Sequence, residues 1–231
     1  MSLILHIETT TDVCSVALSK DGELLLSRED RKGPSHAAKL GPFVDEVIAW
    51  MEQKNWVPDA VAVSAGPGSY TGLRIGVSMA KGLCYAWGIP MIAVSTLAIL
   101  VEALKHRGRL SQGDCVRPLM DARRMEVYTA LYASDGRLLK PVEAKILESE
   151  SFCDEQPEGT FWFVGNGAEK FKEISACSNA CFDVDLVPLA ADMRFLAETA
   201  FAKSDFVDVA YFEPYYLKDF VATISKKNVL A

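Results

Sequence analysis

Two acidic residues stand at matching places in two similar stretches of this 231-residue chain. Glu8 opens the run Glu-Thr-Thr after one apolar segment, and Asp121 opens Asp-Ala-Arg-Arg after another. Paired carboxylates that face one cleft can hold a metal–nucleotide or act as a general base. The arginines of the second run suit an anion or a salt-bridged partner better than a second metal. We therefore predict a nucleotide or anion site whose candidates include Glu8, Thr9, Thr10, Asp121 and Arg123.

Two glycine-rich turns are the second candidate for anion binding. Gly66-Pro67-Gly68 follows the apolar segment 61–63, and Gly165-Asn166-Gly167 follows the apolar segment 162–164. A strand that leads through such a turn into a helix gathers backbone N–H groups at the positive helix end. The first turn is neither a Walker loop nor a G-x-G-x-x-G motif, because Thr71 occupies the last glycine position. A tight turn that needs glycine for its own geometry explains the pattern equally well.

Small residues recur every four positions in the predicted helix 71–87, as Gly72, Gly76 and Ala80. A glycine inside a helix costs about 1 kcal/mol relative to alanine, so close approach by another element is expected to offset that cost. The approaching element is either this protein's own sheet or helix, or a helix of a partner chain. The spacing leaves both alternatives open.

The histidines and cysteines do not predict a metal site. His6 lies in an apolar strand and is expected to be a core residue, and His106 closes a helix. His36 opens a helix, but Leu40 occupies the position four residues on, where a second ligand would stand. The six cysteines lack metal-ligand spacing, and we expect reduced, mostly buried thiols. A Gly-x-Ser-x-Gly elbow is also absent around Ser69, so hydrolase activity is weakly supported.

These residues need a framework of two similar halves. Apolar alternation and the Asp21-Gly22 turn predict a three-stranded meander over residues 3–29, followed by a helix over 35–53. A strand at 61–63, a helix over 71–87, a strand at 92–94 and a helix over 95–106 complete the first half. The same order restarts near Cys115, but its spacing is shorter by about one helix, equivalent to 35–53. We predict an α/β fold of two copies, 1–110 and 111–231, with the second copy reduced. A further helix is expected near 191–203, and no structure is assigned after Ile224.

The charge balance is acidic. The net charge is −7, and half of the residues are hydrophobic, which is enough for a sizeable core. An acidic chain is poorly suited to gripping nucleic acid alone, because such binding depends on basic side chains that contact phosphates. The N-terminus has no positive region, and no apolar run approaches a membrane span, so we expect a cytoplasmic protein without a membrane contact.

Four segments together resemble the TsaB family, the dimerisation subunit of the bacterial tRNA threonylcarbamoyladenosine machinery. They are Leu5–Thr10, Ser64–Gly76, Met120–Tyr128 and Pro214–Leu217, and the second is long and highly specific. The resemblance implies a duplicated actin-like ATPase fold, shared with hexokinase and the Hsp70 chaperones. It agrees with the internal repeat.

The resemblance also implies a division of labour. The catalytic relative TsaD carries a His-x-x-x-His metal pair on the helix that here begins near His36, and Leu40 breaks that pair. The family implies a non-catalytic scaffold that forms a heterodimer with a TsaD homologue, is joined by the ATPase TsaE, and forms a homodimer when alone. It implies that the chain requires no cofactor, although ATP or ADP could bind in the cleft or at the partner interface. It also implies that the chain contacts tRNA only as part of the complex.

For this reading, the expected partner interface comprises Leu40, Val44, Val47, Tyr70, Thr71, Gly72, Leu73, Arg74, Gly76 and Ala80. The alternative is an autonomous kinase or ATPase of the same fold, which would need Glu8 and Asp121 to hold Mg–ATP. A peptidase, as the older glycoprotease label suggests, is a weaker alternative because neither metal ligands nor a nucleophile are in place.

Overall fold

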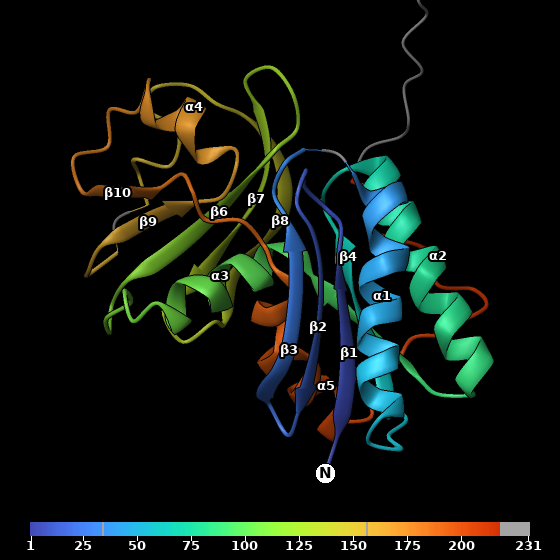
Figure 1. Cartoon of the computed structure of the whole chain (residues 1–231). Helices are drawn as coiled ribbons and strands as arrows, with labels where there is room; N and C mark the ends of the chain where they lie inside the picture. Colours follow the sequence, from blue (N-terminus) through green and yellow to red (C-terminus); the bar gives the residue numbers. More distant parts are fainter. Residues whose placement is uncertain (34, 156, 218–231) are drawn as a thin grey trace, which may run out of the picture.

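The computed structural model describes residues 1–33, 35–155 and 157–217, and it contains two five-stranded sheets with the same strand order (Figure 1). In each sheet an antiparallel meander of three strands is extended by two parallel strands. The first sheet has the order β3-β2-β1-β4-β5, with β1 (Leu3–Glu8), β2 (Cys14–Lys20), β3 (Glu23–Asp30), β4 (Ala60–Gly66) and β5 (Met91–Ser95). The second has the order β8-β7-β6-β9-β10, with β6 (Cys115–Asp121), β7 (Glu126–Ala133), β8 (Leu138–Ile146), β9 (Phe161–Val164) and β10 (Ala180–Asp183).

This matched topology confirms the predicted α/β duplication, and the helices confirm that the second copy is reduced. The first copy has α1 (His36–Glu52), α2 (Tyr70–Trp87) and α3 (Thr96–His106). The second has the short α4 (Ala168–Lys172), a 3-10 turn (Ala190–Met193) and α5 (Arg194–Ala202). Between β8 and β9, where an equivalent of α1 would lie, the described residues form turns.

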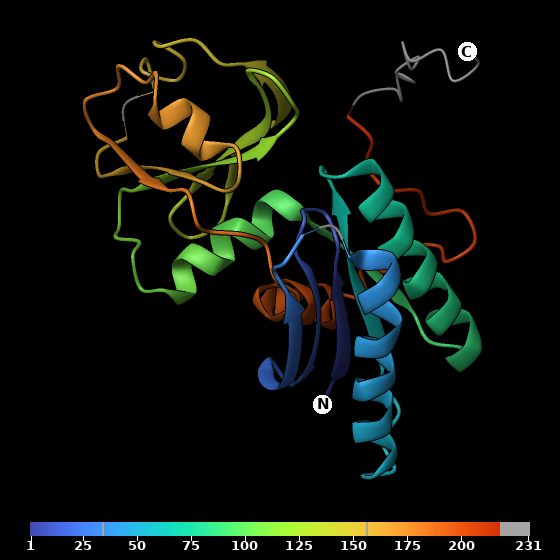
Figure 2. The same cartoon turned by 45° about the horizontal axis from the view of Figure 1, so that its top comes forward.

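The helices cover both faces of the first sheet, and α3 lies between the sheets (Figure 2). Strand β1 shows why, because its side chains alternate between faces. Leu5 and Ile7 join the core beneath α1 and α2, whereas Ile4 packs with Met193 and Ala197 on the opposite face. The helix α5 therefore packs against the first sheet, although it lies within the predicted second range, 111–231.

The helix α1 was predicted correctly in position but wrongly as an interface. Leu40, Val44, Val47 and Met51 follow helical spacing, and each is buried against the first sheet. Side chains that fill this chain's own core offer no surface to another chain, so Leu40, Val44 and Val47 are removed from the expected interface. At the start of α1, the Ser35 hydroxyl donates to Asp30 and makes no cap hydrogen bond.

The turns that replace the missing helix are held by two features that the sequence analysis did not anticipate. Arg117 of β6 is fully buried, donates through Nε to Glu155 at 2.9 Å, and stacks its guanidinium 4.1 Å from the Phe152 ring centre. A disulfide joins Cys153 to Cys177. The expectation of reduced thiols is therefore wrong for this pair.

Candidate functional site: a groove on helix α2 and two anion-like turns

The turn after β1 uses its own acid to satisfy its backbone. Glu8 is fully buried, and its Oε1 accepts hydrogen bonds from the Thr10 backbone N–H, at 2.6 Å, and from the Thr10 hydroxyl. Burial raises the pKa of Glu8 to about 7, against the lowering effect of these hydrogen bonds. The carboxylate thus occupies both Thr10 donors and has no contact with solvent. Glu8 is therefore not accessible to a Mg–nucleotide in this conformation, and its role in holding one stays a prediction.

The first glycine-rich turn packs directly onto this same turn. The Ser69 backbone N–H donates to the Thr10 carbonyl at 2.8 Å. A Cβ atom added to Gly68 would lie 2.5 Å from the Thr10 Cβ, and one added to Gly66 would lie 2.8 Å from the Tyr215 carbonyl oxygen. The structure thus brings the predicted residues Glu8, Thr9, Thr10, Gly66 and Gly68 together. These residues contact each other. The glycines are therefore explained by the close packing of the two turns.

The second pair of turns repeats this packing with a more open rim. Cβ atoms added to Gly165 and Gly167 would lie 2.7 and 2.9 Å from the Leu119 carbonyl oxygen, so these glycines also serve close packing. Asp121, in contrast, is exposed and pairs with the Lys170 ammonium. Arg123 is exposed beside it. Of the two predicted acids only Asp121 reaches the surface, so they do not form a pair across a cleft.

The stripe of small residues on α2 faces the protein's own β1–β2 turn. A Cβ atom added to Gly72 would lie 1.9 Å from the Thr9 carbonyl oxygen, and one added to Gly76 would lie 2.3 Å from the Thr9 hydroxyl. That hydroxyl donates to the Gly72 carbonyl at 2.8 Å. Leu73 and Ala80 are buried on the same side. The expected partner contacts of Gly72, Leu73, Gly76 and Ala80 are therefore wrong, because this face is already covered from within the chain.

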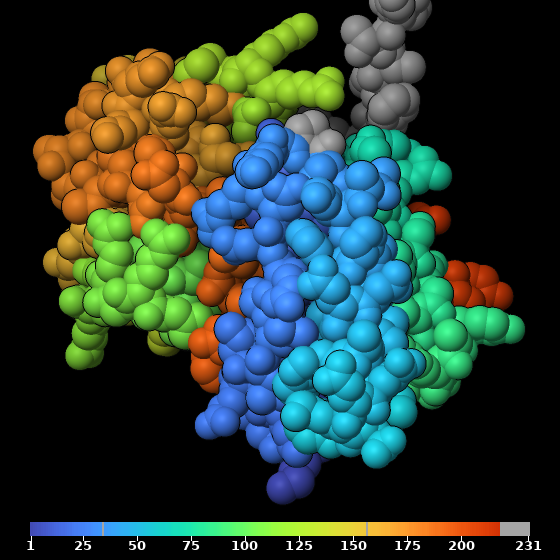
Figure 3. All heavy atoms as spheres, in the orientation of Figure 1, coloured from blue at the N-terminus to red at the C-terminus, as the bar shows by residue number. Residues whose placement is uncertain are grey.

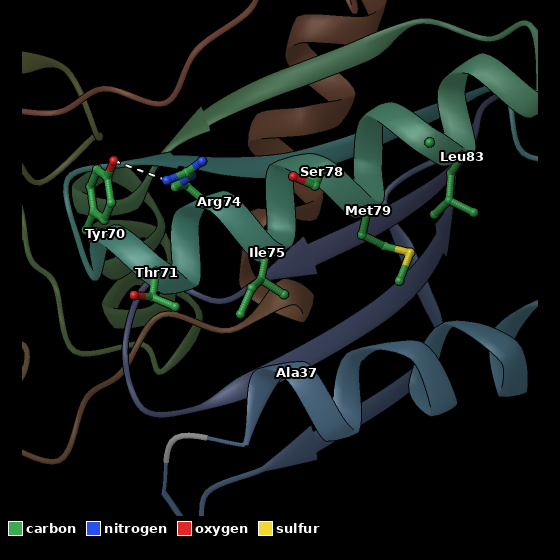
Figure 4. Close-up of a pocket in the computed structure, with 9 residues that line it drawn as sticks. Ala37, Tyr70, Thr71, Arg74, Ile75, Ser78, Met79 and Leu83 are labelled. Atoms are coloured by element: carbon green, nitrogen blue, oxygen red, sulfur yellow. Dashed lines mark hydrogen bonds between the residues drawn. The ribbon is translucent and has the colours of Figure 1, made fainter.

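The side of α2 next to this stripe carries an apolar groove that borders α1 (Figure 4). In Figure 4 the side chains of Ile75, Met79 and Leu83 point from α2 toward the α1 side, where Ala37 lies. The cavity volume is about 740 Å³. Three residues of the expected interface, Tyr70, Thr71 and Arg74, line it, and its other lining residues are Ala37, Ile75, Ser78, Met79, Gly82 and Leu83. Ile75, Met79 and Leu83 were not among the expected interface residues, although their four-residue spacing marks a second apolar stripe on α2.

One end of the groove is polar and aromatic. Arg74 donates to the Tyr70 hydroxyl at 3.3 Å, with its guanidinium 5.5 Å from the Tyr70 ring centre. Tyr216 lies against the same ring, with 4.9 Å between centres. The C-terminal segment that carries Tyr216 is fixed nearby, since the Tyr215 backbone N–H donates to the Ala65 carbonyl at 2.7 Å. The groove therefore combines an apolar floor with a polar, aromatic end.

The comparisons with known proteins agree with this architecture. The family model "TsaD: tRNA N6-adenosine threonylcarbamoyltransferase" matches residues 32–226. The tRNA threonylcarbamoyladenosine biosynthesis protein TsaB of Escherichia coli is 33% identical, over 95% of this chain and 96% of its own length. The protein of the same name from Haemophilus influenzae is 27% identical, over 94% and 93%.

The chain belongs to the TsaB family. A solved structure named YeaZ from Pseudomonas aeruginosa is 31% identical and superposes with a TM-score of 0.76, over 94% of this chain and all of that one. A second structure from Pseudomonas aeruginosa, described as an uncharacterized protein with similarity to peptidase YeaZ, gives 30% identity and a TM-score of 0.77. The whole architecture, both sheets included, is thus shared with solved relatives.

The buried histidines His36 and His6 each have a hydrogen-bond partner within the protein. A ring nitrogen of the buried His36, Nε2, lies 2.7 Å from the Thr11 carbonyl oxygen, and Leu40 lies in the core. His6 is buried as expected, with Nε2 2.7 Å from the Ser19 hydroxyl, and burial lowers its pKa to about 3. Among the described residues, no three His, Cys, Asp or Glu side chains cluster closely enough to hold a metal ion. Within the same residues, no helix is long and apolar enough to cross a membrane.

Proposed function

We propose that this protein is a non-catalytic scaffold subunit of the machinery that makes tRNA threonylcarbamoyladenosine, the modified adenosine next to the anticodon. In this role it binds and activates a TsaD homologue as a heterodimer, and a TsaE homologue joins the pair. Family membership supports the pathway. The observation that carries the scaffold role is the apolar groove on α2, which borders α1 and is covered by no other described part of the chain.

The groove has the character of a docking surface for a protein helix. Ile75, Met79 and Leu83 offer an apolar stripe, and the flanking Thr71, Arg74 and Ser78 offer polar groups. An apolar centre with a polar rim is the usual anatomy of a protein interface. A stable interface buries roughly 1,600 Å² in total, which α1 and α2 together can supply. In the absence of the TsaD homologue, the same face would join two copies of this chain.

The alternative, an autonomous kinase or ATPase, needs a nucleotide in the cleft. Glu8 is buried and bonded to Thr10, so it is poorly placed for that task. The chain is therefore proposed to need no cofactor of its own, and ATP or ADP would bind with the help of a partner. ATP hydrolysis by the homogeneous chain tests this alternative: turnover that Glu8→Ala and Asp121→Ala abolish would favour the ATPase.

The scaffold role is tested by a matched pair of substitutions in α1. Ala37 lines the groove, whereas Ala38 is also exposed and lies one position further around the helix. Ala37→Glu places a charge against the apolar stripe, where burial without a partner is costly. We expect Ala37→Glu to abolish co-elution with the purified TsaD homologue in gel filtration, and Ala38→Glu to leave it unchanged.

Equal melting temperatures of the two variants would show that both remain folded. Normal co-elution of Ala37→Glu would contradict the groove as the docking surface. Failure of the unmodified chain to co-elute with the TsaD homologue would contradict the scaffold role itself.

A further inference from the structure

The exposed turn between β6 and β7, residues 122–125, presents two cationic side chains without partners. Arg123 and Arg124 are both exposed, and neither guanidinium has a hydrogen bond or ion pair within residues 1–33, 35–155 and 157–217. In a chain of net charge −7, most cations are expected to be balanced locally. Here Arg31, Arg109 and Arg117 each pair with a carboxylate.

The backbone of this turn is strained in a way that its sequence does not explain. Arg123 and Arg124 adopt φ angles of +71° and +53°, in the left-handed region that suits glycine or asparagine. Positive φ at consecutive positions is usual in the turn of a β-hairpin, but asparagine and glycine are preferred there over arginine. Strain of this kind persists where surrounding structure enforces it, and it is found disproportionately at functional positions.

Lys170 of α4 is the residue that enforces the conformation. Its ammonium donates to the Asp121 carboxylate, to the Arg124 carbonyl at 2.8 Å and to the Glu126 carbonyl at 2.6 Å. Asp121 is held further, because its backbone N–H donates to the Asn166 side chain at 2.9 Å. The Lys170 ammonium thus donates three hydrogen bonds that hold the turn. Lys170 is therefore a third cation beside Arg123 and Arg124. Asp121 and Glu126 are the acidic residues near these three cations.

The location of the turn relates it to the groove. In Figure 1 the β6–β7 turn rises at the same end of the molecule as the N-terminal ends of α1 and α2, and in Figure 3 side chains of this region project at that end, between the two halves. The aromatic residues Tyr70, Tyr215 and Tyr216 gather at the N-terminal end of α2 as well, and the last two are 49% and 37% exposed. A partner seated on the groove would leave the arginines beside its surface.

We infer that Arg123 and Arg124 contact backbone phosphates of the tRNA when this chain is bound to its TsaD homologue, an inference that rests on the proposed function. Arginine binds phosphate in a bidentate manner. The turn is exposed and convex, which suits an extended polyanion, whereas a free nucleotide is normally held in a concave pocket. Exposed tyrosine rings at the same end favour RNA over an acidic protein, since bases stack on aromatic rings.

The test uses the purified complex of this chain with its TsaD homologue, without the TsaE homologue. Binding of an unmodified tRNA transcript with adenosine next to the anticodon is measured by fluorescence anisotropy at several salt concentrations. We expect Arg123→Ala and Arg124→Ala each to weaken binding and to reduce the slope of log affinity against log salt by about 1. Arg124→Lys should restore most of the slope, because the charge is kept.

The control is Arg137→Ala, which removes an exposed arginine from the turn at the opposite end of β7. It should leave both affinity and slope unchanged. Unchanged tRNA binding in Arg123→Ala and Arg124→Ala would overturn the inference. It would also be overturned if these variants lost co-elution with the TsaD homologue in gel filtration without RNA, since the arginines would then contact that protein. Absence of any complex with the unmodified chain would instead contradict the proposed function.

Discussion

At the scale of single residues, the buried acid Glu8 satisfies the backbone of the turn that follows β1. Its Oε1 accepts from the Thr10 backbone N–H at 2.6 Å. A buried carboxyl of this kind is expected to be costly when ionised, and its pKa is accordingly raised to about 7. The conformation therefore links the stability of the first half to pH.

Replacement of Glu8 by glutamine should remove that pH dependence. Between pH 4.5 and about 7 the native protein keeps a proton on Glu8 that the unfolded chain releases, so this group's stabilising effect is lost as the pH rises. Glu8→Gln has no proton to lose. We expect its free energy of unfolding, relative to the unmodified chain, to increase by roughly 2–3 kcal/mol between pH 5 and pH 8.

Thermal melts at the two pH values measure this difference. His6 titrates in the opposite sense, because its pKa is lowered to about 3, and its stabilising effect is lost as the pH falls below its ordinary value. It is present in both proteins and cancels in the comparison. A constant difference between Glu8→Gln and the unmodified chain would show that Glu8 does not titrate in this range.

Two glycines of α2 should respond to alanine with opposite signs. At Gly76 an added methyl group would meet the Thr9 hydroxyl at 2.3 Å, whereas at Gly82 it would meet nothing within 4 Å. We expect Gly76→Ala to lower the free energy of unfolding by about 1–3 kcal/mol through overpacking. Gly82→Ala should raise it by up to about 1 kcal/mol through helix propensity. Chemical denaturation measures both, and a stabilised Gly76→Ala would contradict the packing of this stripe on Thr9.

At the scale of elements, the sequence predicted positions better than orientations. The period of Leu40, Val44 and Val47 located α1, and the helix expected over 95–106 is α3, which Ser95 caps by accepting from the Ala98 backbone N–H. The small-residue stripe of α2 located a close approach but not its partner. A stripe of this kind has the same appearance whether the protein's own turn or another chain covers it, so only the fold could decide.

Tertiary pairings in the second half were likewise beyond the sequence. The disulfide between Cys153 and Cys177 and the ion pairs of Arg117 join segments that are distant along the chain and lack a recognisable motif. Arg117 ties the turns between β8 and β9 to the sheet, and the disulfide ties them to the loop between α4 and β10. Arg117 contributes a buried charge, which demands a partner.

The two carboxylates that pair with Arg117 should differ sharply in importance. Glu155 is 13% exposed and receives two hydrogen bonds from the guanidinium, whereas Glu143 is 48% exposed and receives one at 3.3 Å. We expect Glu155→Gln to cost about 3 kcal/mol or more, since a buried cation loses its main counter-charge. Glu143→Gln should cost less than about 1 kcal/mol. Urea denaturation monitored by circular dichroism measures both, and equal effects would contradict the ranking.

At the scale of the whole molecule, duplication placed two similar turns in two different environments. The first turn is closed by Glu8 and by the packing of α2, and the second remains open with Arg123 at its rim. The internal repeat and the family resemblance predicted the fold class and the reduced second copy. They could not predict this asymmetry, because the burial of Glu8 depends on how the Gly66–Gly72 turn seats against Thr9 and Thr10.

The isolated chain should bind tRNA weakly. Its net charge of −7 opposes a polyanion, and the two unpartnered arginines of the β6–β7 turn supply only a few phosphate contacts. Each contact adds modestly to affinity, and the sum falls steeply with salt. We expect fluorescence anisotropy at physiological salt to show no saturation with the chain alone at micromolar concentrations, and clear saturation once the TsaD homologue is added. Tight, salt-sensitive binding by the chain alone would contradict a role that depends on its partner, and it would assign RNA recognition to this subunit itself.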